Sequence, residues 1–236
     1  VELARVMTYK SAWQIDNGIG GHKTEASFNV ETRRDWHAWL RAKYETIERL
    51  NHFMGTRFWG QVVTDFVQVP MPMHAPTVYN PALIVDWKRF CSDTLVAYVR
   101  MQADVLRELS PGIPVTHNLR ALTRDFDHFD MADVLDFVSL DSYATIKART
   151  AENACALDMM RSLKKRDVKT PDDDPGFWVI EQKAGHVNWQ DVNSLVRPGV
   201  VRLFTYQGIS RGASGIFYFF WRQPRIGPEK FYGGVL

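Results

Sequence analysis

Short apolar runs alternate along this chain with longer segments in which apolar residues recur every three or four positions. Such alternation predicts buried strands followed by amphipathic helices. The segment 32–50 has a helical period throughout, and the segment 81–110 begins with Asn80-Pro81, a capping residue followed by a proline in the first turn. We expect helices at 1–10, 32–50, 81–110, near residue 131, and at 151–165 and 198–211. We expect strands at 12–16, 114–118, 136–141, 177–181 and 215–221.

Strands that are apolar throughout and alternate with helices are typical of a parallel sheet covered on both faces. Polar residues follow each strand, and in (β/α)-barrels the chemistry lies at that carboxyl end. A doubly wound sheet would instead show a glycine-rich phosphate loop after its first strand. The run Gly18-Ile19-Gly20-Gly21 has the wrong spacing, and no helix begins on it. The pattern therefore predicts an α/β barrel-type fold, with residues 1–236 forming a single domain.

Composition narrows the functional classes. The 236 residues are 45% hydrophobic and carry a net charge of +2, which indicates a globular chain with one sizeable core. Its one basic cluster, at 164–169, lies where a helix ends, so we expect no nucleic-acid partner. No apolar run approaches the ~20 residues of a membrane span. Two distant cysteines suit a reducing compartment, and we expect a cytoplasmic protein without membrane contact.

Candidate metal ligands are few. His22, His117 and His186 lack the spacing of a ligand set, and the loop 22–30 contains no cysteine. We therefore expect neither a metal ion nor a cofactor.

Several ordered motifs resemble one known family. They include Trp-Gln-Ile-Asp-Asn at 13–17, Gly-Thr-Arg-Phe-Trp at 55–59, Phe-Trp-Val-Ile-Glu-Gln at 177–182 and Phe-Trp-Arg-Gln at 220–223. These are similar to glycoside hydrolase family 42, the β-galactosidase family of retaining glycosidases, over nearly the whole chain. The resemblance implies a (β/α)₈ TIM barrel, of which the five parallel strands resemble strands four to eight. On that basis this is a partial barrel.

The resemblance also implies a set of site residues. Glu181 is the expected nucleophile, and Asn17 is expected to bind the sugar 2-hydroxyl. The expected sugar-lining residues are Trp59, Tyr143 and Trp189, and Glu229 is expected to bind a sugar hydroxyl. The chemistry is consistent, because a retaining enzyme needs a carboxylate at the anomeric carbon and a second carboxyl group about 5–5.5 Å away. Aromatic faces suit the C–H face of a galactose ring.

Each assignment has a simpler alternative. Glu181 could cap a neighbouring backbone, Asn17 could serve a turn, and the tryptophans could be core residues.

Two positions depart from the family pattern. Gly18 stands where the family has its acid/base glutamate, and Tyr232 stands where the family usually has histidine. The family's first three βα units and its later domains also have no counterpart in this sequence. Since five strands cannot close a barrel of eight, the outer strands would leave open edges. We therefore expect a homo-oligomer, most simply a two-fold dimer, that covers the open side.

The predicted function is that of a β-galactosidase-like retaining glycoside hydrolase acting on terminal β-galactosides. Its activity should be weak or lost, because Gly18 cannot donate the proton that a general acid supplies. One alternative is a catalytically inactive, truncated homologue with a sugar-binding or structural role. Another is a different hydrolase activity on the remaining rim, for which Asp16, Glu25 and Asp141 are candidate acids.

Overall fold

The computed structural model describes residues 12–21, 23–144, 150–164, 176–189, 193 and 195–236. By their contacts they form two compact units. The first takes its residues from 1–18, 99–123 and 128–236, and the second from 19–98 and 124–127. The helix predicted at 1–10 lies outside the described residues. The single-domain interpretation of 1–236 stays a prediction.

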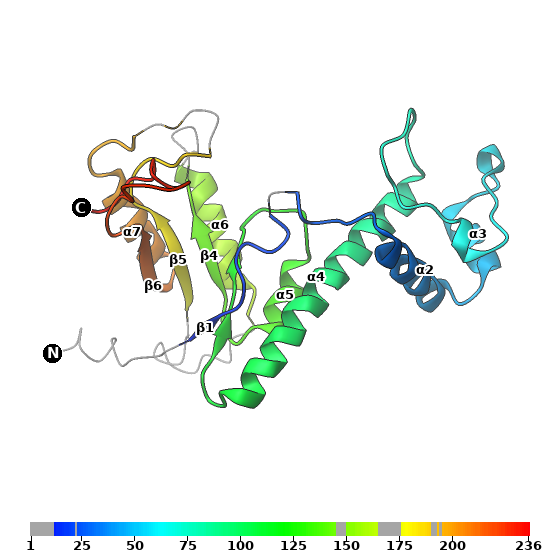
Figure 1. The fold of residues 1–236 in the computed structure, drawn as a ribbon, viewed down its shortest axis with the longest axis horizontal. Coiled ribbons are helices and arrows are strands. Elements are labelled where there is room, and N and C mark those ends of the chain that lie inside the picture. Colours follow the sequence, from blue (N-terminus) through cyan, green and yellow to red (C-terminus); the bar gives the residue numbers. More distant parts are fainter. Residues whose placement is uncertain (1–11, 22, 145–149, 165–175, 190–192, 194) are drawn as a thin grey trace. The chain divides into compact units, whose positions relative to one another are not determined.

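The first unit is built on parallel strands (Figure 1). Strand β1 (Trp13–Gln14) pairs with β2 (Val115–Thr116), and a four-stranded sheet has the order β3 (Asn118–Leu119), β4 (Ser139–Ser142), β5 (Phe177–Lys183) and β6 (Ala213–Phe219). Only His117 separates β2 from β3. The strand predicted at 114–118 contains β2, but β3 begins at its last residue and ends at Leu119. The parallel order confirms the predicted fold class, although β6 begins two residues earlier than expected.

Helices of the first unit cover this sheet. They are α5 (His128–Val134), α6 (Thr150–Ser162) and α7 (Val200–Ser210). Helix α6 contacts β4, and α7 contacts β5 and β6 (Figure 1). The inner strands are largely buried, as Phe177 and Val179 of β5 show with exposures of 0% and 1%, whereas β1 and β6 contain no buried residue. Burial of the inner strands leaves the polar residues at the carboxyl ends as the groups available for chemistry.

The second unit is helical. It contains α2 (Val30–Tyr44), α3 (Ile47–Met54) and two short 3₁₀ helices, η1 (Phe58–Gly60) and η2 (Phe66–Gln68). It also includes the first part of α4 (Pro81–Leu109), up to Tyr98. Its core is aromatic: the Trp36 and Trp87 rings meet edge to face with centroids 5.4 Å apart, an arrangement that aromatic pairs favour.

The single helix predicted at 32–50 is wrong, because the chain breaks between α2 and α3. Glu45 has φ 65° and ψ −49°, outside the right-handed helical region. Thr46 then caps α3 by accepting a hydrogen bond from the Arg49 amide at 3.3 Å. The apolar period continues across the break because Tyr44 and Leu50 are buried in the same core.

Within the described residues, no helix is both long and apolar enough to cross a membrane.

Candidate active site

Glu181 lies near the carboxyl end of β5, where it is partly exposed between the buried residues Val179 and Gln182. Tyr143, just after β4, donates its hydroxyl hydrogen to Glu181 Oε2 at 2.7 Å. Burial raises the pKa of Glu181, the Tyr143 hydrogen bond opposes this, and the charge of Glu229 adds to the increase. The strand and its neighbour thus fix a carboxyl group in position, and a phenol favours its charged form.

Aromatic rings surround this carboxyl group. The Trp189 and Tyr143 rings meet edge to face with centroids 5.3 Å apart. Tyr232 is buried, and its ring centroid lies 5.6 Å from that of Phe219. Its side chain also forms a hydrogen bond with Trp189. Burial raises the pKa of Tyr232, and the charges of Glu229 and Glu181 raise it further. Trp189 as a whole residue remains 48% exposed, so its side chain is available to a sugar.

Asn118 connects two strands of the same rim. Its Nδ2 donates to Asn17 Oδ1 at 2.6 Å and to Asp141 Oδ2 at 2.8 Å. Its Oδ1 accepts a hydrogen bond from the Gly18 amide at 3.0 Å. One amide side chain therefore holds the segment after β1 against the end of β4.

Asp141 has the most perturbed carboxyl group of this rim. Burial raises its pKa to about 7, and the Glu181 charge adds to the increase, while Asn118 and Arg120 oppose it. Its Oδ1 is buried and has no hydrogen-bond partner among the described residues. Asp141 and Glu181 are direct partners in the β4–β5 register, so two carboxyl groups face each other on neighbouring strands.

Gly18 adopts φ +55°, a left-handed conformation that favours glycine. A Cβ built on it would have no atom within 4 Å. The backbone beside Asn118 therefore leaves open space at the position where the resemblance expects an acid.

The structure brings together many of the predicted site residues. Glu181, Tyr143 and Trp189 are in contact, and Glu229 acts on Glu181 through its charge. Asn17 joins the same rim through Asn118. The roles of these residues in sugar binding stay predictions.

Trp59 belongs to the second unit. It is 75% exposed in η1 and has φ 57°. Its predicted place in the sugar site stays a prediction.

Sequence reasoning missed the links among the rim residues. Asn118 and Asp141 are recognisable as polar residues at strand ends, but nothing in their spacing shows that Asn118 bridges Asn17 and Asp141. The strand order and register supply that information.

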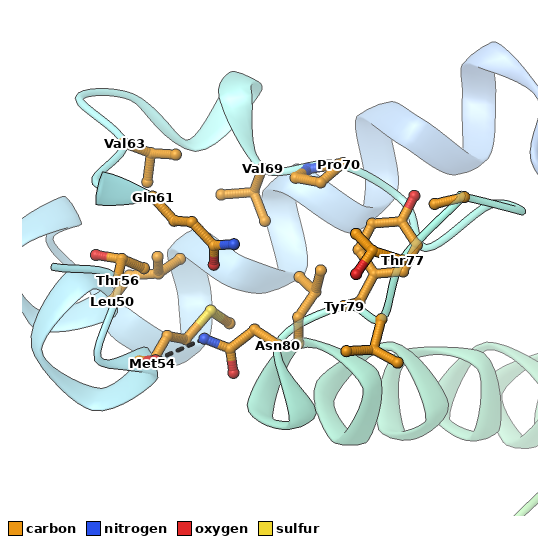
Figure 2. Close-up of a pocket in the computed structure, with 13 residues that line it drawn as sticks. Leu50, Met54, Thr56, Gln61, Val63, Val69, Pro70, Thr77, Tyr79 and Asn80 are labelled. Atoms are coloured by element: carbon orange, nitrogen blue, oxygen red, sulfur yellow. Dashed lines mark hydrogen bonds between the residues drawn. The ribbon is translucent and has the colours of Figure 1, made fainter. Parts of the chain in front are cut away.

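The second unit contains a separate cavity of about 320 Å³ (Figure 2). Apolar side chains such as Leu50, Val63 and Val69 line it, with Gln61 and Thr77 among the few polar ones. Asn80 also lines the cavity, and its side-chain Nδ2 already donates a hydrogen bond to the Met54 carbonyl at 2.7 Å. None of the described residues that line this cavity carries a carboxyl group.

The described residues include no group of three or more histidine, cysteine or acidic side chains placed to hold a metal ion.

Comparison with known proteins gives consistent matches. The family model for β-galactosidases of the Glyco_hydro_42 type matches residues 7–236. A β-galactosidase from Geobacillus kaustophilus is 36% identical over 225 residues, which cover 95% of this chain and 32% of that protein. One from Thermus thermophilus is 34% identical over 242 residues, covering 95% of this chain and 36% of that protein. The chain thus spans about a third of the length of the curated relatives it matches.

Solved structures agree with these matches. The crystal structure of a β-galactosidase from the psychrophilic Marinomonas ef1 superimposes with a TM-score of 0.85 at 30% identity, over 98% of this chain and 38% of that one. A β-galactosidase from Bacillus circulans sp. alkalophilus also gives 0.85 at 30% identity, over 99% of this chain and 34% of that one.

Proposed function

This chain belongs to glycoside hydrolase family 42, the β-galactosidase family, and from that premise we propose that it is a retaining glycosidase with Glu181 as its nucleophile. The observation that carries the proposal is the position of Glu181 at the carboxyl end of a parallel strand, with the Tyr143 hydroxyl bonded to Oε2 at 2.7 Å. Terminal β-galactosides are the proposed substrates.

The environment of Glu181 suits a nucleophile. Attack at an anomeric carbon requires the charged carboxylate. Burial opposes that charge, whereas the Tyr143 hydrogen bond stabilises it. The resulting balance gives a carboxylate that is only lightly solvated and held in one orientation.

Neighbouring side chains suit a sugar. Trp189 offers an exposed aromatic face beside Tyr143, and such faces pack against the apolar face of galactose. Asn17 and Glu229 would bind sugar hydroxyl groups. A cytoplasmic location and self-association stay predictions.

Gly18 favours a second candidate function. A homologue without an acid at this position could bind galactosides and not cleave them, because alkoxide leaving groups depart slowly without a proton. The open space beside Gly18 would then be part of a binding site only.

The test is covalent trapping. The purified protein is incubated with 2,4-dinitrophenyl 2-deoxy-2-fluoro-β-galactoside, whose leaving group needs no proton, and is analysed by peptide mass spectrometry. We expect one fluorosugar on the peptide that contains Glu181. Glu181→Gln should abolish labelling and lower turnover of dinitrophenyl β-galactoside by on the order of 10⁴-fold or more.

Glu152→Gln is the matched control, since Glu152 lies exposed on α6, and it should label normally. Saturable galactose binding without any labelling would favour the binding-only candidate. Neither binding nor labelling would contradict both.

A further inference from the structure

Retaining cleavage needs two carboxyl groups, and the residue at the family's acid position, Gly18, has no side chain. The described rim nevertheless holds a second carboxyl group next to Glu181. Asp141 and Glu181 are partners in the β4–β5 register, and neighbouring strands lie about 4.8 Å apart. The register shifts just before this pair, but Tyr143, two residues after Asp141, donates a hydrogen bond to Glu181, and the Glu181 charge acts on Asp141. Both carboxyl groups therefore lie on one face of the sheet, and a strand spacing of this size suits the ~5–5.5 Å between the carboxyl groups of retaining glycosidases.

We propose that Asp141 is the general acid, and then the general base, of this site in place of the absent side chain at position 18. The proposal rests on the proposed function and adds a second catalytic residue to it. It gives the chain a complete pair of carboxyl groups from two adjacent strands.

The hydrogen bonds of Asp141 leave one oxygen available. Oδ2 accepts a hydrogen bond from Asn118 Nδ2 at 2.8 Å, which fixes the plane of the carboxyl group. Oδ1 is buried and has no partner among the described residues, so its proton, when present, is not used by a neighbouring group and would go to a substrate oxygen brought against it. The same Asn118 side chain bonds to the Gly18 amide, which puts Asp141 one side chain away from the position of the missing acid.

Burial keeps Asp141 partly protonated near neutral pH. Burial and the Glu181 carboxylate raise its pKa to about 7, and Asn118 and Arg120 limit the increase. A general acid works best when its pKa lies near the operating pH. Two carboxyl groups whose environments differ can therefore divide the roles, with Glu181 charged and Asp141 protonated.

Other candidate acids fit less well. Asp16 is exposed, and its Oδ1 accepts the Asn17 amide hydrogen at 2.7 Å. Glu25 belongs to the second unit, where its charge acts on Cys91 of α4. Neither is a register partner of Glu181.

The proposed reaction balances in two steps. In the first, a Glu181 oxygen bonds to the anomeric carbon, the glycosidic C–O bond breaks, and the Asp141 proton goes to the leaving oxygen. In the second, the Asp141 carboxylate takes a proton from water while the water oxygen bonds to the anomeric carbon. The bond to Glu181 breaks, and both carboxyl groups return to their starting forms.

The test is Asp141→Asn, which keeps the shape of the side chain and removes its acid. Phenyl β-galactoside needs a proton to depart, so its turnover should fall by about 10²–10⁴-fold. The first-turnover burst with dinitrophenyl β-galactoside should remain, because it needs only Glu181, and it also reports that the variant is folded. Azide should then accelerate the variant's steady-state turnover and give β-galactosyl azide, since azide attacks without a base.

Two comparisons complete the test. Asp158→Asn removes a half-exposed carboxyl group on α6 that pairs with Arg211 and should leave both substrates unaffected. In the unaltered protein, turnover of phenyl β-galactoside should fall as pH rises through about 7, because Asp141 then loses its proton. This pH dependence is measured on the unaltered protein, so it tests the role of Asp141 even if a variant fails to fold.

The outcomes separate this inference from the proposed function. If the fluorosugar labels Glu181 but Asp141→Asn keeps full activity on the phenyl substrate, the role of Asp141 is wrong and the nucleophile stands. The same conclusion follows if the unaltered protein shows no loss of activity between pH 6 and pH 8. If Glu181 is never labelled, the proposed function is wrong, and the role of Asp141, which rests on it, is wrong with it.

Discussion

At the scale of single residues, Gly18 has a left-handed backbone conformation that favours glycine, and open space lies where a side chain would begin. Its φ of +55° costs a residue with a side chain about 1–2 kcal/mol, but no atom lies within 4 Å of an added Cβ. We expect Gly18→Glu to lower stability by about that amount and to raise turnover of phenyl β-galactoside, because a second acid reaches the leaving oxygen.

The matched variant Gly18→Gln carries the same strain without a proton to donate. It should lose equal stability, measured by urea unfolding, and gain no activity. Equal activity of both variants would show that the position does not face the leaving group.

Lys183 is a second residue with a clear energetic expectation. It lies in β5, is 1% exposed, and has no ion-pair partner among the described residues. Burial lowers its pKa, so the unfolded chain holds the proton more tightly and stability rises with pH as Lys183 becomes neutral. Lys183→Met should stabilise the protein by about 0.5–2 kcal/mol at neutral pH, because it removes a charge that burial disfavours.

This gain should shrink as pH rises toward the ordinary pKa of lysine, and urea unfolding at several pH values measures it. Lys88→Met, at an exposed position of α4, should change stability by less than about 0.5 kcal/mol. A loss of stability in Lys183→Met at every pH would contradict the argument.

The sequence indicates which residues are candidates for the site better than it indicates which of them contact one another. Glu181 is recognisable because an acid ends an apolar strand within a specific motif. The pairing of Asp141 with Glu181 depends on the order and register of β4 and β5, which arise from long-range packing. A single sequence carries no direct signal for that.

At the scale of elements, helices α2 and α4 are joined by a polar cluster inside the second unit. Asp86 of α4 is 3% exposed, pairs with Lys43, and accepts the Tyr44 hydroxyl hydrogen at 2.6 Å. Asp86→Ala should cost about 2–4 kcal/mol, because it leaves the buried Tyr44 hydroxyl and the Lys43 charge without their acceptor. The shift of the urea midpoint measures this cost.

Asp65→Ala provides the comparison. Asp65 pairs with Arg41 of α2 at 3.5 Å, but both side chains are at least half exposed. Exposed pairs contribute about 0–1 kcal/mol, so this variant should unfold close to the unaltered protein. Similar losses in both variants would show that burial does not set the strength of the Asp86 cluster.

Element boundaries show what periodicity can predict. The helix predicted at 81–110 matches α4 (Pro81–Leu109) because Asn80-Pro81 and Pro111-Gly112 mark both ends chemically. The break at Glu45 has no such mark. Thr46 is a good capping residue, but the apolar spacing continues through it, so the 3.6-residue period predicts one helix where the chain makes two.

At the scale of the whole molecule, α4 contributes to both compact units. Leu83 and Trp87 are buried in the core of the second unit, while Val99 and Ala103, both 0% exposed, belong to the first. A continuous helix is cooperative along its length. We therefore expect the two units to unfold together, as the single-domain interpretation predicts.

Native-state hydrogen exchange with Trp36→Leu tests this expectation. Trp36 is 0% exposed and contacts Trp87 and Phe90 of α4, so the substitution should cost about 3 kcal/mol, as large-to-small core changes do. If unfolding is global, amides of β4 and β5 should lose as much protection as those of α2, although Trp36 belongs to the second unit and these strands to the first. Loss of protection confined to residues 19–98 would instead mean that each unit opens as its own cooperative segment. In that case the proposed chemistry at Glu181 and Asp141 would depend on the stability of the first unit alone.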